Sequence, residues 1–174
     1  MIQLREKDLP AGQLYEIGLK IRAATHQHNC LLLINDRIDI ALAIDADGVH
    51  LRSSSLSPAV ARTLLERDKL IGVSTHSKEE LTEAVEQGAD FATFGPVFFT
   101  PSKAPYGSPK GLTELQEICR ASSIPVYALG GITVTNTPAT MTTGTHGIAV
   151  ISALMTATDT AGVCRKLIDA VGRR

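Results

Sequence analysis

Short apolar runs and longer amphipathic stretches alternate along the chain. The apolar runs, rich in β-branched residues, predict seven strands, over 1–4, 31–34, 48–51, 70–73, 91–94, 125–129 and 147–151. Between most of them, apolar residues recur at helical spacing and predict helices over 13–24, 59–66, 78–87, 112–120 and 161–171. Strands that alternate with helices predict βα units and a parallel sheet. The near-continuous apolar character of the strands is typical of parallel strands covered on both faces.

Turn and cap residues sharpen this pattern. Ser77 and Glu80 have the spacing of a capping box, and Ser57 stands directly before Pro58, so both segments read as helix starts. The one long irregular segment, 98–111, contains three prolines and two glycines. Long irregular segments in compact domains are usually functional loops, so this segment is a candidate part of the active site.

The repeating unit predicts an α/β fold of the (β/α)8 TIM-type barrel class, in one domain over 1–174. Seven strand candidates are one fewer than that barrel needs, so the first βα unit is expected to be lacking. A doubly wound open sheet is the alternative. That fold normally carries a glycine-rich phosphate loop after its first strand, whereas segment 5–8 contains no glycine, which favours the barrel.

Composition and charge narrow the class of protein. The 174 residues are 44% hydrophobic and 20% charged, and 17 basic against 18 acidic residues give a net charge of -1. This balance argues against nucleic acid or a membrane surface as the main partner. The chain has no apolar stretch long enough to span a membrane, and its first residues are charged, unlike a signal peptide. The three cysteines form no CxxC pair, so we expect reduced thiols in a cytoplasmic protein.

Polar residues follow the first strands, where parallel α/β folds gather their reacting groups. The first strand carries Gln3, Arg5 and Lys7, and the second ends in Asn35 and Asp36. Arginine and lysine bind phosphate oxygens, and a single carboxylate such as Asp36 can hold Mg²⁺ that keeps most of its waters. With the Thr-x-Ser-Lys segment at 100–103, these residues predict a diphosphate site. Each piece alone also reads as an ordinary surface turn or helix cap.

The last two strands suggest a second anion site. Gly130-Gly131 would let backbone N–H groups approach an anion, and segment 150–152 runs into a possible short helix. A phosphate site after the last two strands is frequent in (β/α)8 barrels. His50 and His76 also lie near strand ends. We expect hydrogen-bonded packing roles for them more than catalytic ones.

Seven segments in order resemble the thiamine phosphate synthase/TenI family. They cover nearly the whole chain, at 3–7, 34–37, 46–51, 72–76, 94–103, 128–132 and 147–152. The resemblance implies a (β/α)8 barrel, usually dimeric. It also implies a transferase of thiamine biosynthesis, which couples a hydroxymethylpyrimidine diphosphate to a thiazole phosphate and releases diphosphate with Mg²⁺.

The resemblance also implies residue roles. The residues facing the diphosphate would be Arg5, Lys7, Asn35 and Lys103, with Gln3 beside them and Ser74 near the leaving group. Asp36 would be a Mg²⁺ ligand. The thiazole phosphate would meet Thr100 and Ser102, and its phosphate would be bound by Gly131, Ile151 and Ser152. Such chemistry needs charge neutralisation and water exclusion more than a nucleophilic side chain.

Two departures from the family pattern leave alternatives open. Ser55 stands where synthases have a second metal-binding Asp, and a neutral hydroxyl is a poorer Mg²⁺ ligand. The neighbouring Arg52 adds a cation that, as a hypothesis, partly replaces the metal. Loss of this Asp is typical of TenI-type thiazole phosphate tautomerases, but those carry a catalytic His where this chain has Pro96, as synthases do.

A tautomerase would therefore need another acid–base group, and His50 and His76 are the candidates by position. A non-catalytic phosphate-ligand binding paralogue is the other alternative. The second departure is that the family's first strand and helix have no counterpart in the chain, because it begins at the second strand. A barrel with an open edge is expected to expose apolar surface or to self-associate.

Overall fold

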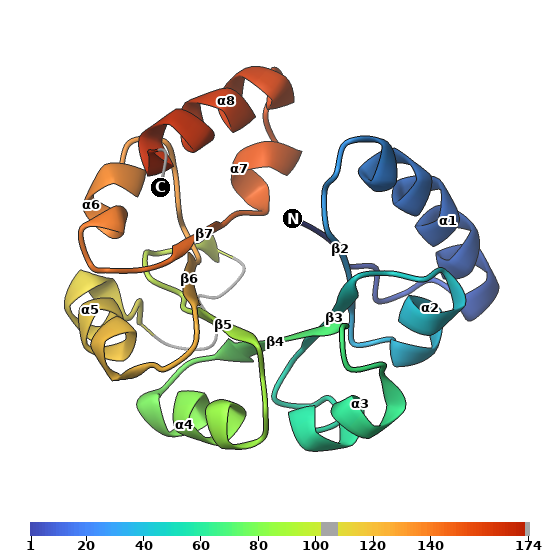
Figure 1. Ribbon diagram of the computed structural model, residues 1–174. Helices are drawn as coiled ribbons and strands as arrows, with labels where there is room; N and C mark the ends of the chain where they lie inside the picture. Colours follow the sequence, from blue (N-terminus) through green and yellow to red (C-terminus); the bar gives the residue numbers. More distant parts are fainter. Residues whose placement is uncertain (102–107, 173–174) are drawn as a thin grey trace. The chain divides into compact units, whose positions relative to one another are not determined.

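The computed structural model of the protein describes residues 1–101 and 108–172. Its strands are β1 (Ile2–Leu4), β2 (Leu32–Asn35), β3 (Gly48–Leu51), β4 (Leu70–Thr75), β5 (Phe91–Phe94), β6 (Val126–Leu129) and β7 (Gly147–Ala149). Its helices are α1 (Ala11–Gln27), α2 (Ile38–Ala43), α3 (Pro58–Leu64), α4 (Lys78–Glu86), α5 (Gly111–Ala121), α6 (Thr137–Met141), α7 (Ser152–Met155) and α8 (Thr160–Val171). Figure 1 shows how strands and helices alternate along the chain.

The seven strands are ordered β1 to β7 in chain order. Neighbours pair in parallel from β1 to β4 and again from β5 to β7. Sequential parallel strands joined by helices are the connectivity of a (β/α)8 barrel with one βα unit fewer, which confirms the predicted fold class. The open-sheet alternative is wrong, because a doubly wound sheet reverses its strand order midway.

The chain divides into two compact units. The first unit comprises Met1–Ser74 and Ala84–Asp90, and the second comprises Thr75–Glu83 and Phe91–Arg174. In the first unit, α1, α2 and α3 lie on one side of β1 to β3 (Figure 1). One apolar cluster forms its core, in which Leu32, Ile34, Val49 and Ile71 are completely buried. In the second unit, α5 packs on β6, and α8 contacts α6 and α7.

Two helices begin at the serine caps that the sequence predicts. Ser57 accepts a hydrogen bond from the Val60 amide and starts α3 with a proline in its first turn. Ser77 likewise accepts from the Glu80 amide before α4. The Glu80 carboxylate reaches the amide of His76, 2.6 Å away, which is one residue earlier than a reciprocal capping box requires.

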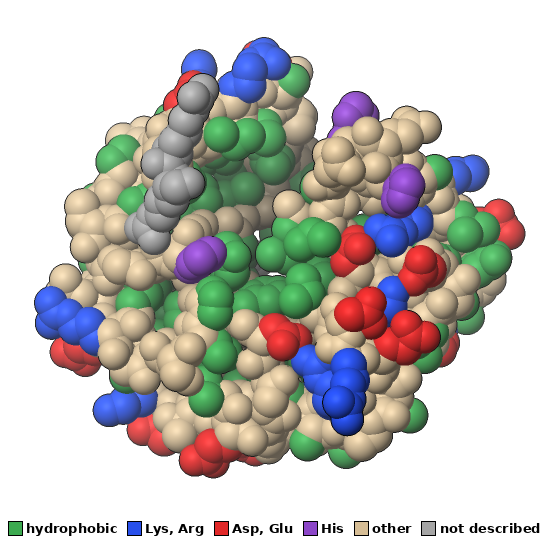
Figure 2. Space-filling view, in the orientation of Figure 1, with side chains coloured by type: hydrophobic (Ala, Val, Ile, Leu, Met, Phe, Trp, Pro, Cys, Tyr) green, Lys and Arg blue, Asp and Glu red, His purple; other side chains and the backbone are tan. Residues whose placement is uncertain are grey.

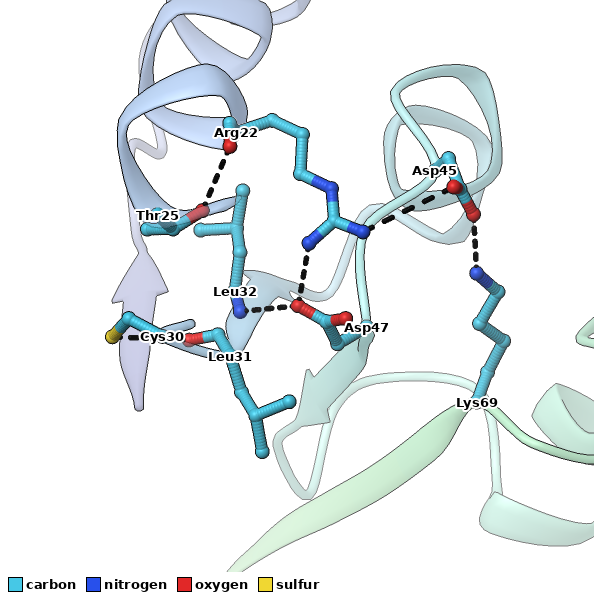
Figure 3. Close-up of polar contacts among 8 residues, drawn as sticks. All are labelled: Arg22, Thr25, Cys30, Leu31, Leu32, Asp45, Asp47 and Lys69. Carbon is cyan, nitrogen blue, oxygen red and sulfur yellow. Dashed lines mark hydrogen bonds and ion pairs between the residues drawn. The ribbon is translucent and has the colours of Figure 1, made fainter. Parts of the chain in front are cut away.

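A repeated polar contact joins the starts of neighbouring strands in the first unit. Asp47, directly before β3, accepts hydrogen bonds from the Leu32 amide at the start of β2 and from Arg22 of α1, both 2.7 Å long (Figure 3). The Arg22 guanidinium also approaches the exposed Asp45, which pairs with Lys69 (Figure 3). Figure 2 shows acidic and basic side chains interspersed on this face of the unit, over α2 and α3. Asp47 therefore ties a helix and two strand starts together.

Asp90, directly before β5, makes the same contact. Its carboxylate accepts from the Ile71 amide near the start of β4, at 2.7 Å, and from Arg62 of α3, at 2.6 Å. We call each such set, an aspartate with a strand-start amide and a helix arginine, an aspartate latch.

Candidate functional site

Three polar side chains meet near the carboxyl ends of β1, β2 and β3. The Gln3 amide nitrogen lies 2.8 Å from His50 Nδ1 and 3.4 Å from Asn35 Oδ1. Parallel pairing sets Asn35 directly beside His50, which explains why the two side chains share a face. Asn35 and His50 are buried, and Gln3 is half-buried. The strand register therefore brings the predicted substrate residues Gln3 and Asn35 together.

The His50 imidazole is held neutral. Burial, followed by the charge of Arg5, lowers the pKa of His50 to about 4. An amide NH₂ group only donates hydrogen bonds, so Gln3 donates to Nδ1 and the ring proton sits on Nε2. This matches the expected packing role, and such a weakly basic imidazole is a poor general base near neutral pH.

Asp36 follows β2 in an unusual backbone conformation. Its φ is 66°, in the left-handed region that aspartate tolerates better than most residues, and its amide donates to the His50 carbonyl at 3.0 Å. The carbonyl of Asp36 accepts from Ile38 as the chain turns into α2. The turn thus fixes the Asp36 carboxylate beside the end of β3.

Arg52 and Ser55 engage this carboxylate. The Arg52 guanidinium donates to Asp36 at 2.7 Å, and the Ser55 hydroxyl accepts from the Arg52 amide at 2.8 Å. Burial acts to raise the pKa of Asp36, but hydrogen bonds from Ser55 and Arg52 and the charges of Arg52 and Arg37 outweigh it and lower that pKa. The carboxylate is therefore ionised and paired with a cation.

The other predicted residues of the first unit are more loosely placed. Arg5 and Lys7 are exposed beyond the end of β1, and Ser74 is half-buried near the end of β4. Arg5 is close enough to His50 to affect its charge state. The exposed cations are available to an anionic ligand at the end of β1.

In the second unit, the glycine pair after β6 is closely packed. Gly131 has φ 64°, and a Cβ there would lie 2.6 Å from the Phe99 carbonyl oxygen. A Cβ at Gly130 would lie 2.6 Å from Pro96 Cα. Both glycines are therefore required by the approach of segment 96–99. The Gly131 carbonyl accepts from Asn136, and its amide N–H has no hydrogen-bond partner among the described residues.

The segment after β7 leads into a short helix, as expected from the sequence. Ile151 and Ser152 are exposed, and Ser152 begins the predicted short helix, α7. Thr100 is half-buried. Ser102 and Lys103 lie outside the described residues.

His76 also has a structural contact. Its Nδ1 lies 2.5 Å from the Gly95 carbonyl oxygen, which can only accept, so Nδ1 carries the proton. The ring is thereby oriented by the loop after β5, as a packing histidine would be.

The donor set does not fit a protein-built magnesium site. Asp36, the predicted ligand, is paired with Arg52, and Ser55 is occupied by Arg52 and Asp36. Across residues 1–101 and 108–172, no three Asp, Glu, His or Cys side chains gather as a metal site. Magnesium at Asp36 stays a prediction that these contacts do not support.

Sequence reasoning missed two features of this region. It expected a packing role for His50 and named it an acid–base candidate only for the tautomerase alternative, but it did not predict the contact with Gln3, which depends on how the strands pair. It also gave Ser55 no role of its own. Ser55 lies two residues before Ser57, which caps α3, and this spacing was a signal for a turn over 52–55. The hydrogen bond from the Ser55 amide to the Arg52 carbonyl closes that turn.

Comparison with known proteins gives a consistent result. Residues 1–154 match the family described as thiamine monophosphate synthase. A putative thiamine-phosphate synthase from Geobacter sulfurreducens is 50% identical over 167 residues, which are 96% of this chain and 78% of that protein. A thiamine-phosphate synthase from Moorella thermoacetica is 43% identical over 172 residues, 99% of this chain and 82% of that protein.

Solved structures agree with the sequence matches. A thiamine phosphate pyrophosphorylase from Pyrococcus furiosus superposes with a TM-score of 0.90 at 39% identity, covering 97% of this chain and 81% of that one. A 3-hexulose-6-phosphate synthase superposes with a TM-score of 0.71 at 19% identity, covering 98% of this chain and 86% of that one, which speaks for the fold alone.

Proposed function

The chain belongs to the thiamine monophosphate synthase family, and from this premise we propose which of its residues carry the family's transferase reaction. The reaction couples a hydroxymethylpyrimidine diphosphate to a thiazole phosphate: a C–N bond forms and diphosphate leaves. The observation that carries the proposal is the polar cluster of Gln3, Asn35 and His50, with the cations Arg5 and Lys7 beyond it.

The first unit would hold the diphosphate substrate. Arg5 and Lys7 neutralise the charge of the leaving diphosphate, Asn35 and Gln3 offer neutral amide groups, and Ser74 a hydroxyl. Because His50 stays neutral, it orients Gln3 without adding charge beside the developing pyrimidine cation. Charge stabilisation by fixed groups is the main catalytic contribution such a departure of diphosphate needs.

The second unit would hold the thiazole phosphate. The Gly131 amide, which has no partner among the described residues, is a donor for a phosphate oxygen, as are the backbone and hydroxyl at Ile151 and Ser152. Thr100, Ser102 and Lys103 remain proposals from the family resemblance.

The tautomerase alternative has less support. It needs an acid–base group, and His50 is too weak a base near neutral pH, which leaves only Nε2 of His76, whose Nδ1 donates to the Gly95 carbonyl. A homodimer, a cytoplasmic location and a single domain over 1–174 are further proposals, whereas Mg²⁺ at Asp36 is not proposed, because Arg52 pairs with that carboxylate. No helix of the described chain is long and apolar enough to cross a bilayer.

A product assay tests the proposed function. Purified protein is mixed with hydroxymethylpyrimidine diphosphate and thiazole phosphate, with and without Mg²⁺, and thiamine phosphate is detected by oxidation to its fluorescent product. We expect product, and loss of turnover in Arg5→Ala but not in Arg67→Ala, an exposed arginine in the turn before β4. Absence of product while thiazole phosphate still binds would support a binding-only paralogue.

A further inference from the structure

The contact between Arg52 and Asp36 lies where the family pattern places two metal-binding carboxylates. Arg52 follows β3 and Asp36 follows β2, and both belong to the first unit. The two side chains are about one-third exposed, at 34% and 30%. A ligand in solvent can therefore reach the pair.

Ser55 completes the arrangement. Its amide donates to the Arg52 carbonyl at 2.9 Å and its hydroxyl accepts from the Arg52 amide, so segment 52–55 is a closed turn. The same hydroxyl is hydrogen-bonded to Asp36. The residue that replaces the second carboxylate thus fixes the backbone from which Arg52 extends.

The net charge of the site is the same with Arg52 and one carboxylate as with a divalent cation and two carboxylates. Two carboxylates with one divalent cation carry no net charge, and one carboxylate with one guanidinium carries none either. With a neutral Ser55 and only one carboxylate, a bound divalent cation would leave the site with a net positive charge. Arg52 offsets the single charge of Asp36 without any ion.

The Arg52 guanidinium has N–H donors that Asp36 does not use. Of the hydrogen bonds among the described residues, the Arg52 guanidinium makes one, through Nη2 to Asp36. Its Nε is buried and without a partner in the same set. Arginine has five N–H donors in a planar fork that suits phosphate oxygens, so the remaining donors of this one-third-exposed side chain can bind an anion while Asp36 holds the group in place.

We propose that Arg52, positioned by Asp36 and Ser55, is a diphosphate-binding residue that supplies the charge a metal ion supplies in two-carboxylate sites. The ligand class is a diphosphate ester or free diphosphate. The inference rests on the proposed function for the identity of that ligand. It goes further in stating that diphosphate binding does not depend on a divalent cation.

Calorimetric titration with inorganic pyrophosphate tests the proposal directly. We expect the unmodified protein to bind pyrophosphate in the presence of a chelator, and Arg52→Gln to bind it about tenfold more weakly or worse. Arg37→Gln is the matched control: it removes an equal charge one residue from Asp36, but from an arginine that pairs with Asp39. It should bind within about twofold of the unmodified protein.

Two further variants keep the proposal testable if Arg52→Gln does not fold. Arg52→Lys keeps the charge without the fork and should give intermediate affinity. The double change Arg52→Gly with Ser55→Asp restores two carboxylates and should make pyrophosphate binding dependent on Mg²⁺. Circular dichroism checks that each variant is folded.

The outcomes separate the two proposals. Binding only with Mg²⁺, or equal affinity in the Arg52→Gln and Arg37→Gln variants, overturns the role of Arg52 even if thiamine phosphate is formed. The protein could also bind pyrophosphate without metal, in a manner that depends on Arg52, and yet form no thiamine phosphate. That result supports the role of Arg52 and contradicts the proposed function.

Discussion

At the scale of single residues, His50 shows how strand packing decides chemistry. A histidine near a strand end reads equally well as a catalyst or as a buried partner, because its environment depends on neighbours distant in sequence. Burial and the contact with Gln3 make it a neutral hydrogen-bond acceptor. The sequence located the residue, but its protonation state depends on burial that only the folded chain defines.

This protonation state predicts a pH dependence of stability. The pKa of His50 is about 4 in the folded chain and 6.5 without perturbation, so the unfolded chain binds the extra proton between these values. Stability is therefore lost as the pH falls from about 6.5 toward 4. Between pH 7 and pH 5 the loss from His50 is about 2 kcal/mol.

Urea unfolding at the two pH values measures this loss. His50→Asn removes the titrating ring, so the variant should lose less stability than the unmodified protein over the same interval. Equal losses in the two proteins would show that His50 is not the group responsible.

Gly131 gives a second prediction at this scale. Its backbone is left-handed, and a Cβ would meet the Phe99 carbonyl oxygen at 2.6 Å. Gly131→Ala should therefore lower the free energy of unfolding by about 2 kcal/mol, measured by urea denaturation.

Gly12→Ala is the control for Gly131, because nothing lies within 4 Å of a Cβ in that helical position. It should be neutral or slightly stabilising. Similar losses at both glycines would contradict the packing argument.

At the scale of elements, the predictable ones were those with long or strongly apolar patterns. β3 and β5 have the predicted bounds, and the five predicted helices are all present with each end within three residues of its predicted position. The two missed helices are short. In α2, Ile38 and Ile40 are both buried and alternate as in a strand, and α6 is rich in threonine.

Tertiary contacts hold these short helices in place. α6 packs against α8, and α2 packs against α1 and β2. Such support is invisible in local propensity, which is why the sequence pattern predicted no helix over 38–43 or 137–141.

The aspartate latch yields the prediction for elements. Asp47→Ala would leave the buried strand-start amide of Leu32 and the Arg22 guanidinium without their acceptor. We expect a loss of about 2 kcal/mol in the free energy of unfolding, measured by urea denaturation.

Asp45→Asn is the matched control, since Asp45 also approaches Arg22 but is 79% exposed, makes no backbone contact of this kind, and has a left-handed backbone that asparagine tolerates. Its removal should cost much less, because exposed ion pairs contribute little. A loss equal to that of Asp47→Ala would show that the backbone bond is unimportant.

At the scale of the whole molecule, strand order and fold class followed from the alternation of strands and helices. The division into two compact units did not, because it depends on which contacts are densest rather than on periodicity. The same argument from strand ends grouped Gln3 with Asn35, and these two side chains are in contact. The pairing of Arg52 with Asp36 was not predicted, since nothing local in the sequence indicates which carboxylate an arginine reaches.

Exposed apolar side chains predict self-association. Ile2 on β1 is 48% exposed, Met155 on α7 is 80% exposed and Ile168 on α8 is 64% exposed. Apolar surface of this kind favours contact with another chain. Sedimentation equilibrium should show a dimer, and a monomer at all concentrations would contradict the proposed homodimer.

The aspartate latches also have a period of two βα units. They link β2 with β3 and β4 with β5, skipping the step between, and each draws its arginine from the helix before the earlier strand. Before β7, His146 donates its amide to the Val126 carbonyl, as Asp47 and Asp90 do to Leu32 and Ile71. The strand-start backbone contact thus recurs at every second βα unit, but the side-chain bonds of the latch reinforce it only before β3 and β5, where the residue is an aspartate.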